Sequence, residues 1–154
     1  MAPVLTQGVS GAGKSTVGSE LGEALHVPFL DADDLHSDDA VHKLSTGVPL
    51  TDDDRWPWLR RVAATTKERA AQNRQHMCVV ACSVLKRVYR DVLRATPDAR
   101  FVFVYLRLAP ALLAERLVQR QGHFMKAAML QSQLDTLEEP RTDEGDVCVV
   151  EITA

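Results

Sequence analysis

The sequence has no surplus of positive charge, because 18 lysines and arginines face 21 aspartates and glutamates and leave a net charge of −3. General nucleic-acid binders normally carry a basic surplus, since they neutralise phosphates and release counterions. The composition therefore argues against nucleic acid as a partner. Any binding of an anion has to depend on basic residues that are placed locally.

Cysteine is scarce, and Cys78, Cys82 and Cys148 share no C-x-x-C spacing. Two of the three lie in apolar runs, where cysteine behaves as a small buried hydrophobic residue. No uninterrupted apolar run approaches the ~18 to 20 residues of a membrane helix, and no charged leader with an apolar segment opens the chain. We therefore expect a reducing, cytoplasmic location and no membrane partner.

Short apolar segments alternate with longer segments of helical spacing, which is the pattern of a parallel sheet covered by helices. With 154 residues, the chain has material for one core, so we expect a single α/β domain over residues 1–154. The apolar segments are continuous, as expected of strands covered on both faces. Strands are predicted at residues 4–6, 27–30, 77–81, 101–106 and 147–152, and helices at about 14–25, 58–72, 85–95, 110–121 and 129–139.

A glycine-rich segment follows the first predicted strand and precedes the first predicted helix. It reads G-V-S-G-A-G-K-S and fits the phosphate-loop pattern G-x-x-x-x-G-K-[ST] without a gap. Its backbone N–H groups can surround phosphate oxygens, Lys14 can reach the β and γ phosphates, and the Ser15 hydroxyl can bind Mg²⁺. The alternative is a chance match in a glycine-rich turn. The predicted nucleotide-binding residues of the loop are Gly8, Ser10, Gly11, Ala12, Gly13, Lys14, Ser15 and Thr16.

A phosphate loop indicates a nucleotide but not a reaction. A GTPase needs a guanine-reading N/T-K-x-D segment, and Thr66–Arg69 lacks the aspartate. A motor or AAA-type ATPase normally needs a larger domain and oligomeric partners. A small-metabolite kinase needs a carboxylate near the loop, an insert that binds the substrate and a lid with arginines, and the sequence offers candidates for all three.

Two acids, Asp31 and Asp33, follow the second predicted strand at the edge where open α/β sheets bind ligands. In an extended backbone both side chains project to the same side, so Asp31 could hold the water shell of Mg²⁺ while Asp33 orients or deprotonates an attacking hydroxyl. The alternative is a solvated helix-capping cluster. His36 could bind the substrate or simply lie on the surface.

Basic residues stand where an anionic substrate could meet them. Arg55 follows the acidic run Asp52–Asp54 and could be held in place for such a substrate, although the acids alone suit the start of a helix. Lys86 lies just past the third predicted strand, at the same ligand edge. Arg87 and Arg90 can share a helix face with Lys86, and a solvated basic face is the alternative interpretation.

Arg116 and Arg120 are four residues apart on a predicted helix that ends at Gly122. Both can point the same way, with a hinge-like glycine behind them. A lid of this kind would exclude water and bring guanidinium groups to the transferring phosphoryl group. The ordinary alternative is a pair of surface arginines on an amphipathic helix.

Taken together, these segments resemble the gluconokinases, P-loop small-molecule kinases related to the shikimate kinases. The phosphate loop is shared by many families, whereas PLTDDDRWPWL, ACSVLK and GHFM…LQSQ…LE-P are specific to this one. The matching segments touch nearly the whole chain and are Gly8–Thr16, Phe29–His36, Lys43–Leu59, Ala81–Arg90 and Gly122–Pro140.

The resemblance implies an enzyme, commonly a homodimer, that uses ATP and Mg²⁺ to convert D-gluconate to 6-phospho-D-gluconate for the pentose phosphate route. It implies a P-loop NTPase fold with a five-stranded parallel sheet of order 2-3-1-4-5, helices on both faces, a substrate-binding insert at about 33–60 and a helical lid at about 116–138. The residues to which it gives roles are Lys14, Asp33 and Arg120 in catalysis, Arg116 and Arg120 at the nucleotide, Asp33, His36, Arg55, Lys86 and His123 at gluconate, and Ser15 and Asp31 at the metal.

The chain departs from the family pattern at a few positions. Ser37 and Ala40 stand where the family usually has proline and asparagine, so we expect the substrate-side helix to start differently. Gln7 replaces an apolar residue before the loop. Relatives commonly continue by about one helix after the last strand, so we expect an exposed sheet flank here. The alternatives to a gluconate kinase are a kinase for another hydroxy acid such as shikimate and a catalytically silent nucleotide-binding module.

Overall fold

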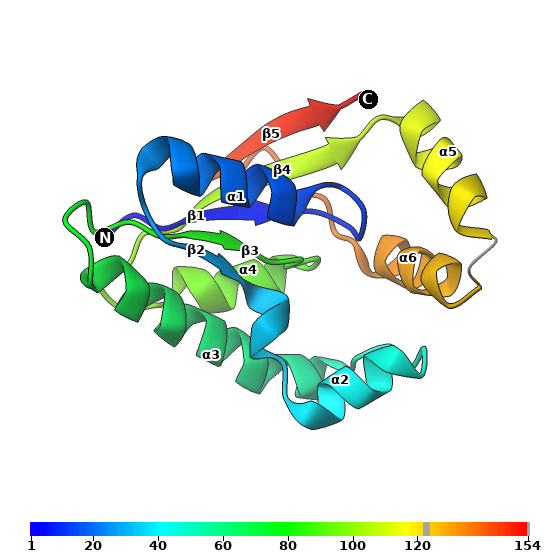
Figure 1. Ribbon diagram of the computed structural model, residues 1–154, viewed down its shortest axis with the longest axis horizontal. Coiled ribbons are helices and arrows are strands. Elements are labelled where there is room, and N and C mark those ends of the chain that lie inside the picture. The colour runs from blue at the N-terminus through cyan, green and yellow to red at the C-terminus, as the bar shows by residue number, and fades with distance from the viewer. Residues whose placement is uncertain (122–123, 154) are drawn as a thin grey trace.

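Five parallel strands form one sheet in the order β2-β3-β1-β4-β5 (Figure 1). The computed structural model describes residues 1–121 and 124–153, and the side chains of all of these except residues 117, 120, 121 and 124–128. The predicted strand order is confirmed. The strands are β1 (Val4–Gln7), β2 (Phe29–Asp31), β3 (Val79–Ala81), β4 (Val102–Leu108) and β5 (Val147–Ile152).

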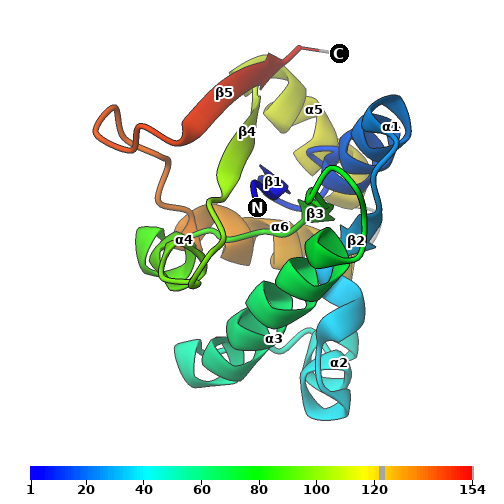
Figure 2. The ribbon, with the colours of Figure 1, turned by 90° about the vertical axis from the view of Figure 1, so that its left-hand side faces the viewer.

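Helices cover both faces of this sheet, as predicted. Helix α1 lies on one face, and α3 and α4 lie on the opposite face (Figures 1 and 2). Helices α5 and α6 lie beyond the carboxyl ends of the strands (Figure 1). The helices are α1 (Lys14–Leu25), the short 3-10 helix η1 (Ala32–Leu35), α2 (Asp38–Ser45), α3 (Asp52–Ala71), α4 (Arg87–Arg94), α5 (Pro110–Gln121) and α6 (Phe124–Thr136).

Helix α3 begins at Asp52, well before the predicted start at residue 58. A capping box starts it, since the Thr51 hydroxyl accepts from the Asp54 N–H and the Asp54 carboxylate accepts from the Thr51 N–H. The helix continues through Pro57. The acidic run therefore occupies the first turn of a helix, and this start places Arg55 one turn in.

Residue spacing alone predicted no helix at α2, although the family resemblance led us to expect a substrate-side helix with a different start. Ser37 caps it, because its hydroxyl accepts from the Ala40 N–H at 3.2 Å, and Ala40 is buried. The two residues that depart from the family pattern thus form a working helix start. Lys43 then ties α2 to the first turn of α3 through an ion pair of 2.8 Å with Asp54.

Strand β5, at the edge of the sheet, has exposed residues at consecutive positions and so is exposed on both faces. Cys148, Val149 and Val150 of β5 are exposed, so the expectation of a fully internal sheet is wrong at this edge, while the expectation of an exposed flank is confirmed. Gln7 at the end of β1 is fully buried, and neither of its amide atoms has a hydrogen-bond partner among the described residues. No helix in the described part of the chain is long and apolar enough to cross a bilayer.

A buried ion network ties α4 to the segment before β5. Arg90, which is completely buried, donates from Nε and Nη2 to both carboxylate oxygens of Glu144 at 2.8 and 2.9 Å. Arg94 donates to Glu144 at 2.7 Å and forms a second pair with Asp146. The interpretation of Arg90 as part of a solvated basic face is therefore wrong, because Glu144 covers its guanidinium.

Glu144→Gln is expected to lower the free energy of unfolding by about 3 kcal/mol at pH 7, because it leaves the charge of Arg90 buried without its partner. Burial alone raises the pKa of Glu144, but the hydrogen bonds from Arg90 and Arg94 outweigh it and lower the pKa from 4.5 to about 2. The unfolded carboxyl is protonated first on acidification, so stability falls as pH drops from about 4.5 towards 2.

Urea unfolding at pH 7 and pH 3 measures both effects. The difference in the free energy of unfolding between the wild type and Glu144→Gln should be smaller at pH 3 than at pH 7. The matched control is Asp143→Asn, which breaks an exposed pair with Arg87 and should lower the free energy of unfolding far less than Glu144→Gln, because solvent screens exposed ion pairs. Equal stability of the two variants would contradict the role of the buried network.

Candidate active site

The phosphate loop joins β1 to α1 and is shaped by close packing. A Cβ atom on Gly8 would lie 2.9 Å from the Leu106 carbonyl oxygen, so only glycine fits there. Gly13, at the N-cap of α1, has a φ of 96°. No described side chain caps α1. The first N–H groups of this helix are therefore placed to bind an anion.

Lys14 lies over this loop. Its Nζ donates to the Val9 carbonyl at 3.2 Å, and its own carbonyl accepts from the Thr6 hydroxyl at 2.9 Å. The first contact holds the ammonium group at the loop, and the second ties the start of α1 to β1. Lys14 is thus positioned at the place where a phosphate chain would lie.

Ser15 and Asp31 meet beside the loop. The Ser15 hydroxyl donates to Asp31 Oδ2 at 2.6 Å, and Asp31 Oδ1 accepts from the Asp33 N–H at 3.0 Å. Among the described residues, no three His, Cys, Asp or Glu side chains gather to hold a metal by themselves. One hydroxyl and one carboxylate nevertheless fit Mg²⁺, which commonly takes few protein ligands and completes its shell with waters and substrate phosphates.

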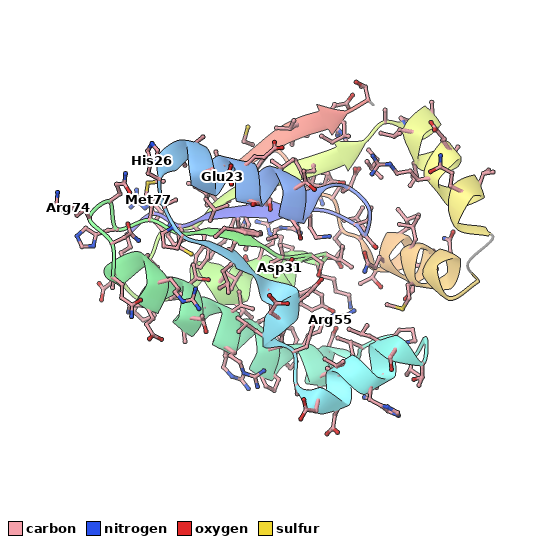
Figure 3. All side chains as sticks on the ribbon, in the orientation of Figure 1. Glu23, His26, Asp31, Arg55, Arg74 and Met77 are labelled. Atoms are coloured by element: carbon pink, nitrogen blue, oxygen red, sulfur yellow. The ribbon has the colours of Figure 1, made fainter. Side chains whose placement is uncertain are left out.

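The local backbone at Asp33 differs from the prediction. The strand ends at Asp31, which caps η1, so the two acids do not share an extended segment. They still serve one region, because Asp31 contacts Ser15 and Asp33 lines the same cavity as Lys14. Figure 3 shows Asp31 and Arg55 toward the carboxyl ends of the strands.

His36 and Trp58 support Asp33. His36 Nε2 lies 3.7 Å from Asp33 Oδ1, and the His36 ring stacks on Trp58 at 4.3 Å between centroids. The Trp58 indole donates to the Ala32 carbonyl at 2.8 Å, which fixes the stack. With its side chain only 6% exposed, His36 is not a surface residue. The pKa of Asp33 is lowered, first by its interaction with His36 and then by the charge of Lys14, so Asp33 is ionised at neutral pH, and its side chain is 73% exposed to the open cavity.

Arg55 is held by a second set of contacts. Its Nη1 donates to the Leu50 carbonyl at 2.7 Å and to the Tyr89 hydroxyl at 3.1 Å, and lies 3.9 Å from Asp52. The Tyr89 hydroxyl donates to Asp52. Burial, followed by this hydrogen bond, raises the pKa of Tyr89 to about 12, so the hydroxyl keeps its proton. The Arg55 side chain is 16% exposed and lines the cavity, so its remaining N–H groups can meet a bound anion.

Lys86 shares the Asp52 carboxylate with Arg55. It pairs with Asp52 at 3.5 Å and lies over the Tyr89 ring, but it is not among the described residues that line the cavity. Asp52 therefore sits between two cations. Arg55, Lys86 and Asp52 together carry a net charge of +1, although the whole chain is acidic.

A cavity of about 650 Å³ connects these parts. The phosphate cradle and the acid at Asp33 open onto this one space, which is the arrangement that phosphoryl transfer to a bound hydroxyl needs. Its lining includes Ser10, Gly11, Gly13, Lys14, Ser15 and Thr16 from the loop and α1, Asp33 and His36, Arg55 and Trp58, and Met129, Ser132 and Gln133 from α6.

Other predicted residues lie elsewhere. Arg87 pairs with Asp143 and is not among the described lining residues. Arg116 is also not among them. The Arg120 side chain and His123 lie outside the part of the chain that the structure describes.

Sequence reasoning gave no site role to several residues at or beside the cavity. Trp58, Tyr89 and Asp52 act through contacts between distant segments, which spacing along the chain does not reveal. Gln133, whose side chain meets the Ser10 N–H, stands in the family-specific segment LQSQ, which was quoted without a role.

Comparisons with known proteins agree with this geometry. A family model described as an AAA domain matches residues 4–140. The chain is 45% identical to the thermoresistant gluconokinase of Escherichia coli, over 94% of this chain and 81% of the relative. It is 42% identical to a probable gluconokinase of Saccharomyces cerevisiae, over 96% of this chain and 80% of the relative.

Solved structures also include a similar gluconokinase. The crystal structure of a gluconokinase from Sinorhizobium meliloti 1021 matches with a TM-score of 0.82 and 42% identity, over 99% of this chain and 83% of that one. The Mycobacterium tuberculosis APS kinase, at 18% identity and a TM-score of 0.64, supports the fold alone. The P-loop NTPase kinase fold is thereby confirmed.

Proposed function

This chain belongs to the gluconokinase family, and we propose that it transfers the γ-phosphoryl group of ATP to the terminal hydroxyl of D-gluconate, giving ADP and 6-phospho-D-gluconate. The observation that carries the proposal is the shared cavity, in which Lys14 at the phosphates, Asp33 and Arg55 all take part. A single cavity lets a bound hydroxyl reach the terminal phosphorus.

At the nucleotide end, the N–H groups at the start of α1 bind phosphate oxygens and Lys14 offsets the charge on the β and γ phosphates. Ser15 and Asp31 would hold Mg²⁺, which draws negative charge from the phosphates when bound. The segment 116–138, which contains the second half of α5 and all of α6, would act as the lid. Arg120 and Arg116 would bring positive charge from it.

At the acceptor end, Asp33 accepts a hydrogen bond from the attacking hydroxyl and takes its proton as the bond to phosphorus forms. Its low pKa suits a group that orients the hydroxyl first. His36 and Arg55, both in the insert 33–60, bind the polyol chain and the carboxylate of gluconate. Lys86, which pairs with Asp52, adds its positive charge to this end of the site. His123 would contact the substrate from the lid.

We also propose an oligomeric state and a location for the protein. The resemblance to the family supports a homodimer. The scarcity of cysteine supports a reducing, cytoplasmic location.

A coupled ADP-release assay tests the acceptor. We expect turnover with ATP and D-gluconate and none with shikimate, because the chain belongs to the gluconokinase family. Both acceptors carry a carboxylate, so the cations of the cavity alone do not distinguish them. Turnover with shikimate alone would remove the substrate assignment. Binding of ATP in a calorimeter without any gluconate-dependent turnover would indicate a silent nucleotide-binding module.

Asp33→Asn is expected to reduce kcat by about 10²- to 10⁴-fold, because the neutral amide cannot accept the hydroxyl proton. ATP affinity should change little, since Asp33 lies outside the phosphate loop. The matched control is Asp34→Asn, its exposed neighbour, which should keep wild-type kcat. An active Asp33→Asn enzyme would contradict the role of this acid.

Tyr89→Phe is expected to raise the KM for gluconate by about 2- to 10-fold, the effect of losing one hydrogen bond that orients Arg55. The kcat and the KM for ATP should stay near their wild-type values. Tyr105→Phe is the control, because that buried hydroxyl contacts Glu139 and not Arg55. A similar rise in the KM for gluconate in both variants would mean that Tyr89 acts only through stability.

A further inference from the structure

Helix α6 contacts the phosphate loop directly through Gln133. The backbone N–H of Ser10 donates to Gln133 Oε1 at 2.6 Å, across 123 positions of sequence. Gln133 lines the same cavity as Lys14 and Asp33. A side chain from the opposite wall of the cavity thus reaches the loop that binds phosphate.

The chemistry of this contact fixes the orientation of the amide. A backbone N–H can only donate, so the atom that it meets must be the carboxamide oxygen. The other end of the group, Nε2, carries two N–H donors and has no hydrogen-bond partner among the described residues. Because Gln133 lines the cavity and is half-buried, these donors are available to a ligand there.

Packing holds α6 at this distance from the loop. Leu130, one turn before Gln133, is completely buried in a cluster that includes Val9 and Ala12 of the loop. At the end of the helix, the Glu138 N–H donates to the Leu85 carbonyl at 2.7 Å. The position of Gln133 is therefore set by two anchors that are independent of its own hydrogen bond.

The neighbourhood indicates which ligand atoms Nε2 would meet. Lys14 Nζ lies 3.2 Å from the carbonyl of Val9, the residue before Ser10, and this ammonium group marks the β and γ phosphates in a phosphate loop. Asp33, which lines the same cavity, marks the attacking hydroxyl. A donor beside Ser10 thus lies on the side of the terminal phosphate.

We propose that Gln133 is a nucleotide-binding residue that donates from Nε2 to an oxygen of the terminal phosphate of ATP, while its Oε1 stays on the Ser10 N–H. This inference rests on the proposed kinase function. The Ser10 contact orients the amide before the nucleotide binds, so little conformational entropy is lost on contact. Since the group is neutral, it adds a donor without adding charge.

Two variants separate this role from a purely structural one. Gln133→Glu keeps the shape and an oxygen for the Ser10 N–H, but it turns a negative oxygen toward the phosphate. Gln133→Met keeps the apolar stem and loses both hydrogen bonds. Gln131→Glu is the matched control, because Gln131 is exposed on the same helix and its amide bonds to Asp135.

Calorimetry with a non-hydrolysable ATP analogue and with ADP provides the readout. Gln133→Glu and Gln133→Met should both weaken binding of the analogue by about 10- to 100-fold, as expected for a hydrogen bond to a charged group. ADP binding should change little, because ADP lacks the terminal phosphate. Gln131→Glu should bind the analogue like the wild type.

Wild-type affinity of Gln133→Glu for the analogue would overturn the proposal and leave Gln133 as a link between helix and loop. An equal loss of analogue and ADP binding would also overturn it, since the effect would then not depend on the terminal phosphate. Neither measurement needs an acceptor. A wrong assignment of gluconate would instead appear as missing turnover in a wild-type protein that binds the analogue normally.

Discussion

The start of α1 has backbone N–H groups that no described side chain caps, and the surrounding structure is arranged around this open cradle. Gly8 packs so closely against Leu106 that no side chain fits at this position. Thr6 then holds the Lys14 carbonyl, which fixes where the helix begins. β1 is the central strand of the sheet, so the strand that leads into this cradle is paired on both sides.

The cations near the cavity are organised by acids and not by a general positive field. Asp52 lies between Arg55 and Lys86, and the Tyr89 hydroxyl bridges Asp52 to Arg55. Side chains that would otherwise be mobile are thereby held in place at little cost in net charge. An acidic protein can in this way bind an acidic metabolite, because selectivity depends on local geometry and not on the overall charge of −3.

Local patterns predicted the strands, most of the helices, the phosphate loop and the acids after β2, because each depends on neighbouring residues. The start of α3 was placed at residue 58, whereas the capping box at Thr51 begins the helix at Asp52. Periodicity placed Arg90 on a helix face but could not show that Glu144 covers it. The stack of His36 on Trp58 and the reach of Gln133 to Ser10 join distant segments, so only the folded chain reveals them.

Helix α4 has two roles on its two sides. Lys86 and Tyr89, at its first turn, face Asp52 and Arg55, while Arg90 and Arg94 are joined to the segment before β5. A substitution that rotated this helix to admit a different acceptor would also strain the buried ion network. Evolution toward new substrates is therefore constrained at α4, and the peripheral α2 is the freer place for it to begin.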